Sequence, residues 1–292
     1  MGAVTTDMSQ QQCEQCEQCQ IHPTPPVPES QMNAQTELQW LEDGNKHFKD
    51  HINILHTGLF ENTAAQPQRP PFLIIGCADS RASEATVFSM LPGTVFASRN
   101  IANQFHSSDT STYSTLAYAV AGMNVNHVIV LGHYGCGGIE AAMKSPCPMP
   151  IDAAQGVVEA WVEPIRELIR NSDRSEIQLL RGEYAAGRVP IDIIIHQAAF
   201  RPLVEENVRA SVVRIAASSV IVNHFARLRD PTNSKVHQGF CAEPPVEPTP
   251  VFIHGWVYDF ADGNVYDLDV SVGPPGVHVP KSNFPKPPPS WI

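Results

Sequence analysis

Two short segments combine cysteine, histidine and glycine in a way that could hold a metal ion. Cys77 follows the apolar run 71–76 directly, and His133 and Cys136 follow the apolar run 127–132. If these runs are neighbouring parallel strands, their carboxyl ends meet at one edge of the sheet and the three side chains converge. Two thiolates and one imidazole leave a fourth tetrahedral position open, and thiolates favour zinc over magnesium or calcium. The sequence therefore predicts a catalytic zinc site with Cys77, His133 and Cys136 as ligands.

A carboxylate and a guanidinium follow the first ligand closely, as Asp79 and Arg81. On an open surface such a pair would be a solvated ion pair that contributes little. Beside a metal, the carboxylate can accept a proton from a bound water or orient the resulting hydroxide, while the guanidinium holds the carboxylate through two hydrogen bonds. Asp79 could also become the fourth metal ligand in a closed state, when Arg81 releases it.

Buried strands that alternate with helices must position these residues. The apolar runs 71–76, 94–97 and 127–132 have the length and composition of buried strands, and helical patterns cover 35–52, 111–123, 137–143, 151–170 and 197–229. Segments 251–258 and 265–269 flank Asp262-Gly263, which is typical of a hairpin turn. We therefore expect an α/β fold, with a mostly parallel β-sheet flanked by helices and a late antiparallel hairpin.

Composition bounds the organisation of the chain. Residues 1–35 are rich in Cys, Gln and Pro, so we expect a flexible extension before a single domain over 36–272 and an extended Pro-rich tail over 273–292. Nineteen basic against thirty acidic residues give a net charge of −11, which argues against nucleic-acid binding. The sequence lacks an apolar run of roughly 20 residues and a signal peptide, so the predicted location is cytoplasmic.

The first nineteen residues contain a second cysteine group, Cys13, Cys16 and Cys19. Residues 1–6 also fit the N-myristoylation pattern at Gly2, and acylated cysteines would supply a second membrane anchor. An unmodified flexible extension is the favoured interpretation, with metal binding or oxidant sensing as alternatives. Neither Cys147 nor Cys241 has a partner suggested by spacing.

The spaced motifs resemble those of the β-class carbonic anhydrases over residues 35–270. Residues 77–81 read C-A-D-S-R and residues 133–138 read H-Y-G-C-G-G, against the family's C-x-D-S-R and H-x-x-C-G-G. Further matches are P-G at 92–93, R-N-I-A-N at 99–103, Y-A-V at 118–120, Trp161, E-E-N-V at 205–208 and H-G-W at 254–256. The long connection 182–200 and both termini depart from the family's compact pattern.

The resemblance implies a carbonic anhydrase, a zinc lyase that reversibly hydrates carbon dioxide to bicarbonate and a proton. One zinc ion would be held by Cys77, His133 and Cys136, and its bound hydroxide would be oriented by a catalytic Asp79–Arg81 pair. Residues of the substrate pocket follow from the same likeness: Gln68, Phe96, Ile101, Tyr118 and Gly138. The family also implies a homodimer or tetramer, with helix 35–52 wrapping a neighbour. For Phe96 and Ile101, an ordinary core role is the alternative.

Three questions stay open at the level of sequence. The proton shuttle could be His106, Tyr134 or solvent. The same scaffold could serve a carbonyl sulfide or carbon disulfide hydrolase, because these gases are also linear and apolar. A non-catalytic protein that binds zinc or senses bicarbonate is a third alternative, although such a protein could dispense with Asp79 and Arg81, and both are present.

Overall fold

The computed structural model describes residues 28–144, 151–185, 200–230 and 247–288, which form two compact units that divide between Pro67 and Gln68. Several sequence predictions therefore concern residues outside the described part of the chain: Gly2, Cys13, Cys16, Cys19, Cys147 and Cys241. Most of the connection 182–200 also lies outside it. The proposed domain limits at 35/36 and 272/273 remain predictions.

The first unit consists of a short 3-10 helix (Glu29–Gln31) and two α-helices, α1 (Ala34–Leu55) and α2 (Leu59–Ala65). Asn33 begins α1 because its side chain accepts hydrogen bonds from the backbone N–H groups of Gln35 and Thr36, and the Thr36 hydroxyl caps Asn33 in return. Several large apolar side chains of α1 are exposed, with Leu41 at 71%. The helix predicted for 35–52 is present and extends slightly beyond both limits.

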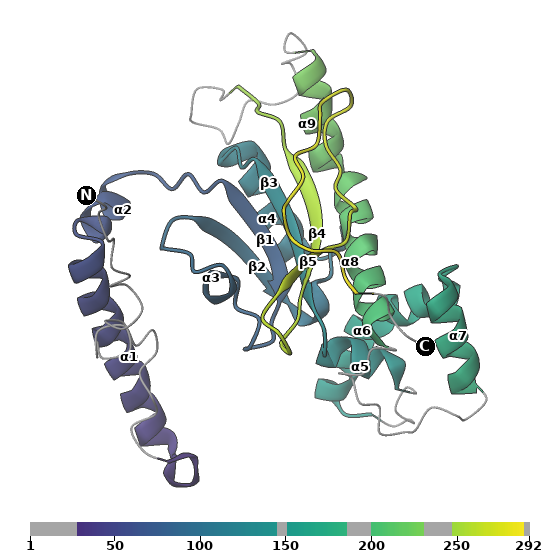
Figure 1. Cartoon of the computed structure of the whole chain (residues 1–292), viewed down its shortest axis with the longest axis horizontal. Helices are drawn as coiled ribbons and strands as arrows, with labels where there is room; N and C mark the ends of the chain where they lie inside the picture. Colours follow the sequence, from purple (N-terminus) through teal and green to yellow (C-terminus); the bar gives the residue numbers. More distant parts are fainter. Residues whose placement is uncertain (1–27, 145–150, 186–199, 231–246, 289–292) are drawn as a thin grey trace, which may run out of the picture. The chain divides into compact units, whose positions relative to one another are not determined.

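The second unit contains one five-stranded sheet in the order β2-β1-β3-β4-β5 (Figure 1). The strands are β1 (Phe72–Cys77), β2 (Val95–Asn100), β3 (His127–His133), β4 (Phe252–Tyr258) and β5 (Val265–Asp267). The first four run parallel, and β5 pairs antiparallel with β4. The predicted fold class, including the late antiparallel pair, is confirmed.

Helices connect the strands of this unit. They are α3 (Glu84–Val87), α4 (Thr110–Ala117), α5 (Gly137–Met143), α6 (Ala153–Asn171), α7 (Ser175–Ala185), α8 (Arg201–Ala216) and α9 (Ser219–Arg229). Two predicted helices differ in detail. The segment 111–123 ends in a π-helical turn over Tyr118–Gly122, and the segment 197–229 holds two helices because Ser218 interrupts it and caps α9. None of the described helices is both long and apolar enough to cross a membrane.

Both faces of the sheet are buried, which explains why its strands are continuous apolar runs. On one face, Leu73, Ile75, Val128 and Val130 pack with the helical side chains of the main core. Helix α8 approaches β3 closely because Gly132 has no side chain; a Cβ there would lie 2.5 Å from Val208 Cγ2. This close approach brings α8 next to the carboxyl edge of the sheet.

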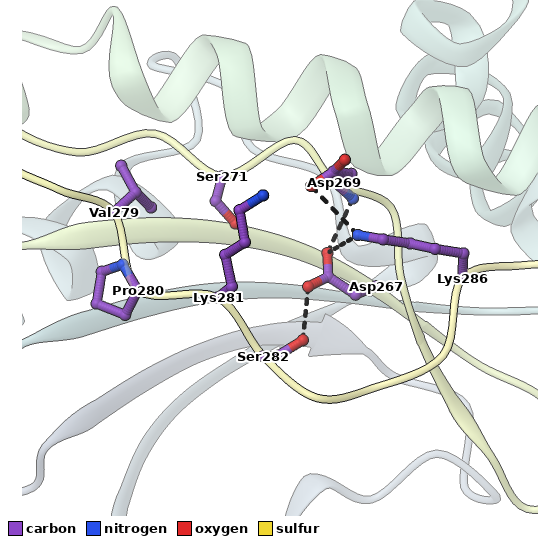
Figure 2. Close-up of a pocket in the computed structure, with 8 residues that line it drawn as sticks. All are labelled: Asp267, Asp269, Ser271, Val279, Pro280, Lys281, Ser282 and Lys286. Atoms are coloured by element: carbon purple, nitrogen blue, oxygen red, sulfur yellow. Dashed lines mark hydrogen bonds and ion pairs between the residues drawn. The ribbon is translucent and has the colours of Figure 1, made fainter.

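The opposite face is covered in part by the C-terminal segment. Phe284 packs edge-on against Trp256, with ring centroids 5.0 Å apart. The described residues 273–288 form no helix or strand, but they bind along β5: the Asp267 N–H donates to the Pro285 carbonyl, and Ser282 Oγ donates to Asp267 Oδ2. Figure 2 shows Lys286 reaching Asp269, at 3.2 Å, beside a cavity of about 220 Å³. Residues 282–286 of the Pro-rich segment are therefore anchored to the sheet.

Candidate metal centre and active site

The sheet register brings the predicted ligands together. Cys77 is the last residue of β1 and His133 the last residue of β3, and these strands are neighbours in the sheet. The chain then turns through Gly135, whose φ of 71° is in the left-handed region, and Cys136 follows as the N-cap of α5. Glycine suits this turn because it has no Cβ to oppose a positive φ.

The three side chains form a buried cluster that could hold a metal ion. The ligand atoms of Cys77, His133 and Cys136 all lie within 4.8 Å of one another, and the two Sγ atoms are 3.9 Å apart. Their residues are 4%, 0% and 2% exposed. The three side chains that were predicted to converge therefore lie together and could hold a metal ion.

The hydrogen bonds of His133 leave one ring nitrogen free for a ligand. Nδ1 lies 3.1 Å from the Tyr134 carbonyl and acts as the donor, because a carbonyl can only accept. Nε2 is buried and has no hydrogen-bond partner among the described residues. A buried nitrogen lone pair beside two sulfur atoms is the arrangement that metal ligation satisfies, with the carbonyl fixing the tautomer.

The surroundings of the cysteine pair favour a thiolate at Cys77. The hydrogen bond between the two Sγ atoms lowers the pKa of Cys77, while the same bond and burial raise the pKa of Cys136. The N–H of Ala102 also donates to Cys77 Sγ, at 3.3 Å. A thiolate is the form of cysteine that binds metals, so this environment favours ligation.

Asp79 and Arg81 form a two-pronged ion pair beside the cluster. Arg81 Nε donates to Asp79 Oδ1 at 3.0 Å and Nη2 to Oδ2 at 2.7 Å, and this pairing lowers the pKa of Asp79 to about 2. The Arg81 guanidinium lies over the Phe260 ring, 4.2 Å from its centroid. Asp79 Oδ2 is 3.8 Å from His133 Nε2, so the carboxylate faces the space where a metal and its free position would lie.

Arg99 holds the backbone of Cys77 and Asp79 in place through two hydrogen bonds. Its Nε donates to the Cys77 carbonyl at 3.0 Å, and its Nη2 donates to the Asp79 carbonyl at 2.7 Å. Glu84, which is buried, lies 3.6 Å from Arg99 Nε. Arg99 was named in the sequence analysis only as part of the R-N-I-A-N motif. Neither Arg99 nor Glu84 was predicted to hold the metal site in place.

An apolar cavity of about 360 Å³ opens beside Cys77 and Asp79. Its lining residues are Cys77, Ala78, Asp79, Ile101, Gly137, Gly138, Ala141, Val158 and Val162. Of the predicted pocket residues, Ile101 and Gly138 are among them. Val158 and Val162 come from α6 and were not predicted, although Trp161 on the same helix was among the family matches.

The other predicted pocket residues lie elsewhere in this single chain. Phe96 and Tyr118 contact each other, with ring centroids 6.0 Å apart, and Gln68 is exposed. Their roles stay predictions. Tyr134 is no longer a candidate for the proton shuttle: its buried hydroxyl donates to Glu205, and burial raises its pKa well above the usual range. His106 is half-buried and bonds to Gln104, and it remains a candidate.

Comparisons with known proteins agree with this geometry. Residues 72–237 match the family model described as carbonic anhydrase. A carbonic anhydrase of Emericella nidulans is 30% identical over 218 residues, which cover 75% of this chain and 77% of that protein. A Coccomyxa β-carbonic anhydrase solved with acetazolamide is 28% identical, with a TM-score of 0.59 over 80% of this chain and 86% of its own. A Sordaria macrospora structure, from work on two tetrameric β-carbonic anhydrases, shares the fold at 23% identity, with a TM-score of 0.61 over 81% of this chain and 98% of its own. The chain belongs to the β-class carbonic anhydrase family.

Proposed function

We propose that this chain is a zinc enzyme that reversibly hydrates carbon dioxide to bicarbonate and a proton. The observation that carries the proposal is the buried cluster of Cys77, His133 and Cys136 with the Asp79–Arg81 pair beside it, facing an apolar cavity. Two sulfur ligands and one imidazole suit zinc and leave one position for water. Zinc bound there would lower the pKa of a bound water toward about 7 and so supply a nucleophile at neutral pH.

The residues of the chain have distinct parts in this reaction. Asp79 can accept a hydrogen bond from the nucleophile and orient it, and Arg81 keeps Asp79 ionised and in place. Ile101, Val158 and Val162 offer an apolar wall to carbon dioxide, which has no net dipole. Gln68 is proposed as a donor to bicarbonate from a second copy of the chain, since it is exposed here.

Asp79 is paired with Arg81 in this structure, which is the arrangement that leaves the fourth metal position for water. We propose that release from Arg81 would let Asp79 bind the metal and close the site, as its 3.8 Å distance from His133 Nε2 permits. Visible spectra of the cobalt-substituted protein across pH test this proposal. If no carboxylate ligation appears while activity falls at low pH, the closed state is excluded.

An assembly of at least two copies is also proposed. Several apolar side chains of α1 are exposed in the single chain, among them Leu38, Leu41 and Leu55. Apolar stripes of this kind usually mark surfaces that another protein covers. Analytical ultracentrifugation measures the assembly directly, and a monomer at all concentrations would contradict it.

The experiment that tests the function compares variants of the ion pair at fixed zinc content. Asp79→Asn and Arg81→Ala should retain zinc but lose carbon dioxide hydration by about 100-fold or more, in line with the usual loss of a general acid–base group. Arg170→Ala is the matched control, because Arg170 pairs with Glu163 at 2.7 Å on the surface of α6 and is about as exposed as Arg81. Full activity in both dyad variants would refute the proposal.

A further inference from the structure

Two adjacent buried residues next to the site, Ala102 and Asn103, have a positive φ. Ala102 is 0% exposed and has a φ of 63°, in the left-handed region. A residue with a Cβ is strained in this conformation, so it persists only where the surroundings hold it. Ala102 lies in the short 3-10 helix Ile101–Asn103, between β2 and α4.

Both polar groups of the Ala102 backbone have specific partners. Its N–H donates to Cys77 Sγ at 3.3 Å. Its carbonyl accepts a hydrogen bond from Asn207 Nδ2 at 2.7 Å. Asn207 lies on α8 and is 1% exposed, in the part of the helix that Gly132 allows to approach β3. The chain of contacts therefore runs from α8 through one residue to the sulfur of the first ligand.

We propose that Asn207 is a positioning residue for the Cys77 ligand, which it controls by holding the Ala102 backbone so that its N–H points at Sγ. This inference rests on the proposed metal site. A hydrogen bond to a ligating sulfur fixes its direction and withdraws charge from it, and loss of such outer contacts typically costs 10–100-fold in metal affinity. The Asn207 side chain is buried, so its bond to the Ala102 carbonyl is shielded from bulk water.

Asn207→Ala tests the proposal with readouts other than activity. The full-length variant is loaded with cobalt, and the sulfur-to-cobalt charge-transfer band is recorded; zinc affinity is then measured by competition with a chromophoric chelator. We expect a shifted band and an affinity about 10-fold lower. Ser211→Ala is the matched control: Ser211 lies on the same helix, is fully buried and donates to the Asn103 carbonyl at 3.5 Å, whereas the Ala102 carbonyl accepts from Asn207.

Rescue separates positioning from a general loss of packing. Glycine adopts a positive φ without strain, so adding Ala102→Gly to Asn207→Ala should restore at least part of the affinity and of the original spectrum. If Asn207→Ala does not fold, Asn207→Ser replaces it, because its hydroxyl is too short to reach the carbonyl.

The inference is overturned if the Asn207 variant matches the wild type in spectrum and in zinc affinity within twofold, or if Ser211→Ala lowers affinity as much. Failure of the proposed metal site has a different signature. In that case the wild-type protein itself shows no thiolate band with cobalt.

Discussion

Gly137 and Gly138 are adjacent at the start of α5, yet the structure gives them opposite tolerance for a methyl group. A Cβ on Gly138 would lie 2.7 Å from Ile101 Cγ2 and 3.0 Å from the Ala102 Cβ. A Cβ on Gly137 meets nothing within 4 Å among the described residues. Gly138→Ala and Gly137→Ala are therefore a matched pair that differ only in what the new methyl group contacts.

The expected difference follows from packing. The 2.7 Å distance requires Ile101 to shift and the 3.0 Å distance crowds Ala102, and forcing a methyl group into a packed core costs about 1–3 kcal/mol. Gly137→Ala has no such cost, and the gain of up to about 1 kcal/mol from helix propensity is common to both variants. We therefore expect the free energies of unfolding of the two variants to differ by about 1–3 kcal/mol. Because the displaced segment carries the N–H that donates to Cys77 Sγ, zinc affinity should also fall in Gly138→Ala.

Differential scanning calorimetry at equal protein and zinc concentrations measures the difference. For a domain of this size, 1 kcal/mol shifts Tm by about 2–4 °C, so Gly138→Ala should unfold about 2–12 °C below Gly137→Ala. Equal Tm values for the two variants would refute the reasoning, because they would mean that the helix start can move away from Ile101 without cost.

Three further predictions concern the rest of the fold. His254 is 4% exposed beside His127, and burial lowers its pKa to about 4. In the unfolded chain the imidazole takes up its proton near pH 6.5, so its contribution to stability is complete above that pH and is lost as pH falls toward 4. The free energy of unfolding should therefore fall by about 1.4 kcal/mol between pH 8 and pH 5.5. Urea unfolding should show this loss in the wild type and less of it in His254→Gln; an equal loss in both would exclude His254 as the cause. Phe284→Ala should lower the unfolding free energy by about 2 kcal/mol, because the ring packs on Trp256, while Val277→Ala, on an exposed part of the same segment, should change it little. Asp152→Ala should lower the free energy of unfolding by about 1 kcal/mol, since the Asp152 carboxylate caps α6 at the Gln155 N–H. An unchanged Tm in Phe284→Ala or in Asp152→Ala would contradict the contact assigned to that residue.

Much of the sheet and of the metal cluster could be predicted because both depend on local patterns. Strands buried on two faces appear as apolar runs, and the runs that end at Cys77 and His133 are adjacent parallel strands. Sheet adjacency alone then brings two ligands together, and the third lies three residues beyond the second. The Asp79–Arg81 pair is equally local, since only one residue separates its members.

The missed features depend on contacts between distant segments. Val158 and Val162 line the cavity only because α6 packs there, and Asn207 reaches Ala102 only because α8 lies close to β3. The left-handed backbone of Ala102 has no signal in its residue type, since alanine usually avoids it. Likewise, the proline content of the C-terminal segment predicts an extended chain but not the contact of Phe284 with the sheet.

Zinc content and stopped-flow carbon dioxide hydration, measured on the same sample of full-length protein, test the central claim most directly. We expect one zinc ion per chain, loss of hydration when a chelator removes the metal, and recovery when zinc returns. Carbonyl sulfide and carbon disulfide, assayed in parallel, should turn over far more slowly. A protein that holds one zinc per chain but does not hydrate carbon dioxide, or that prefers either sulfur gas, would contradict the proposed function.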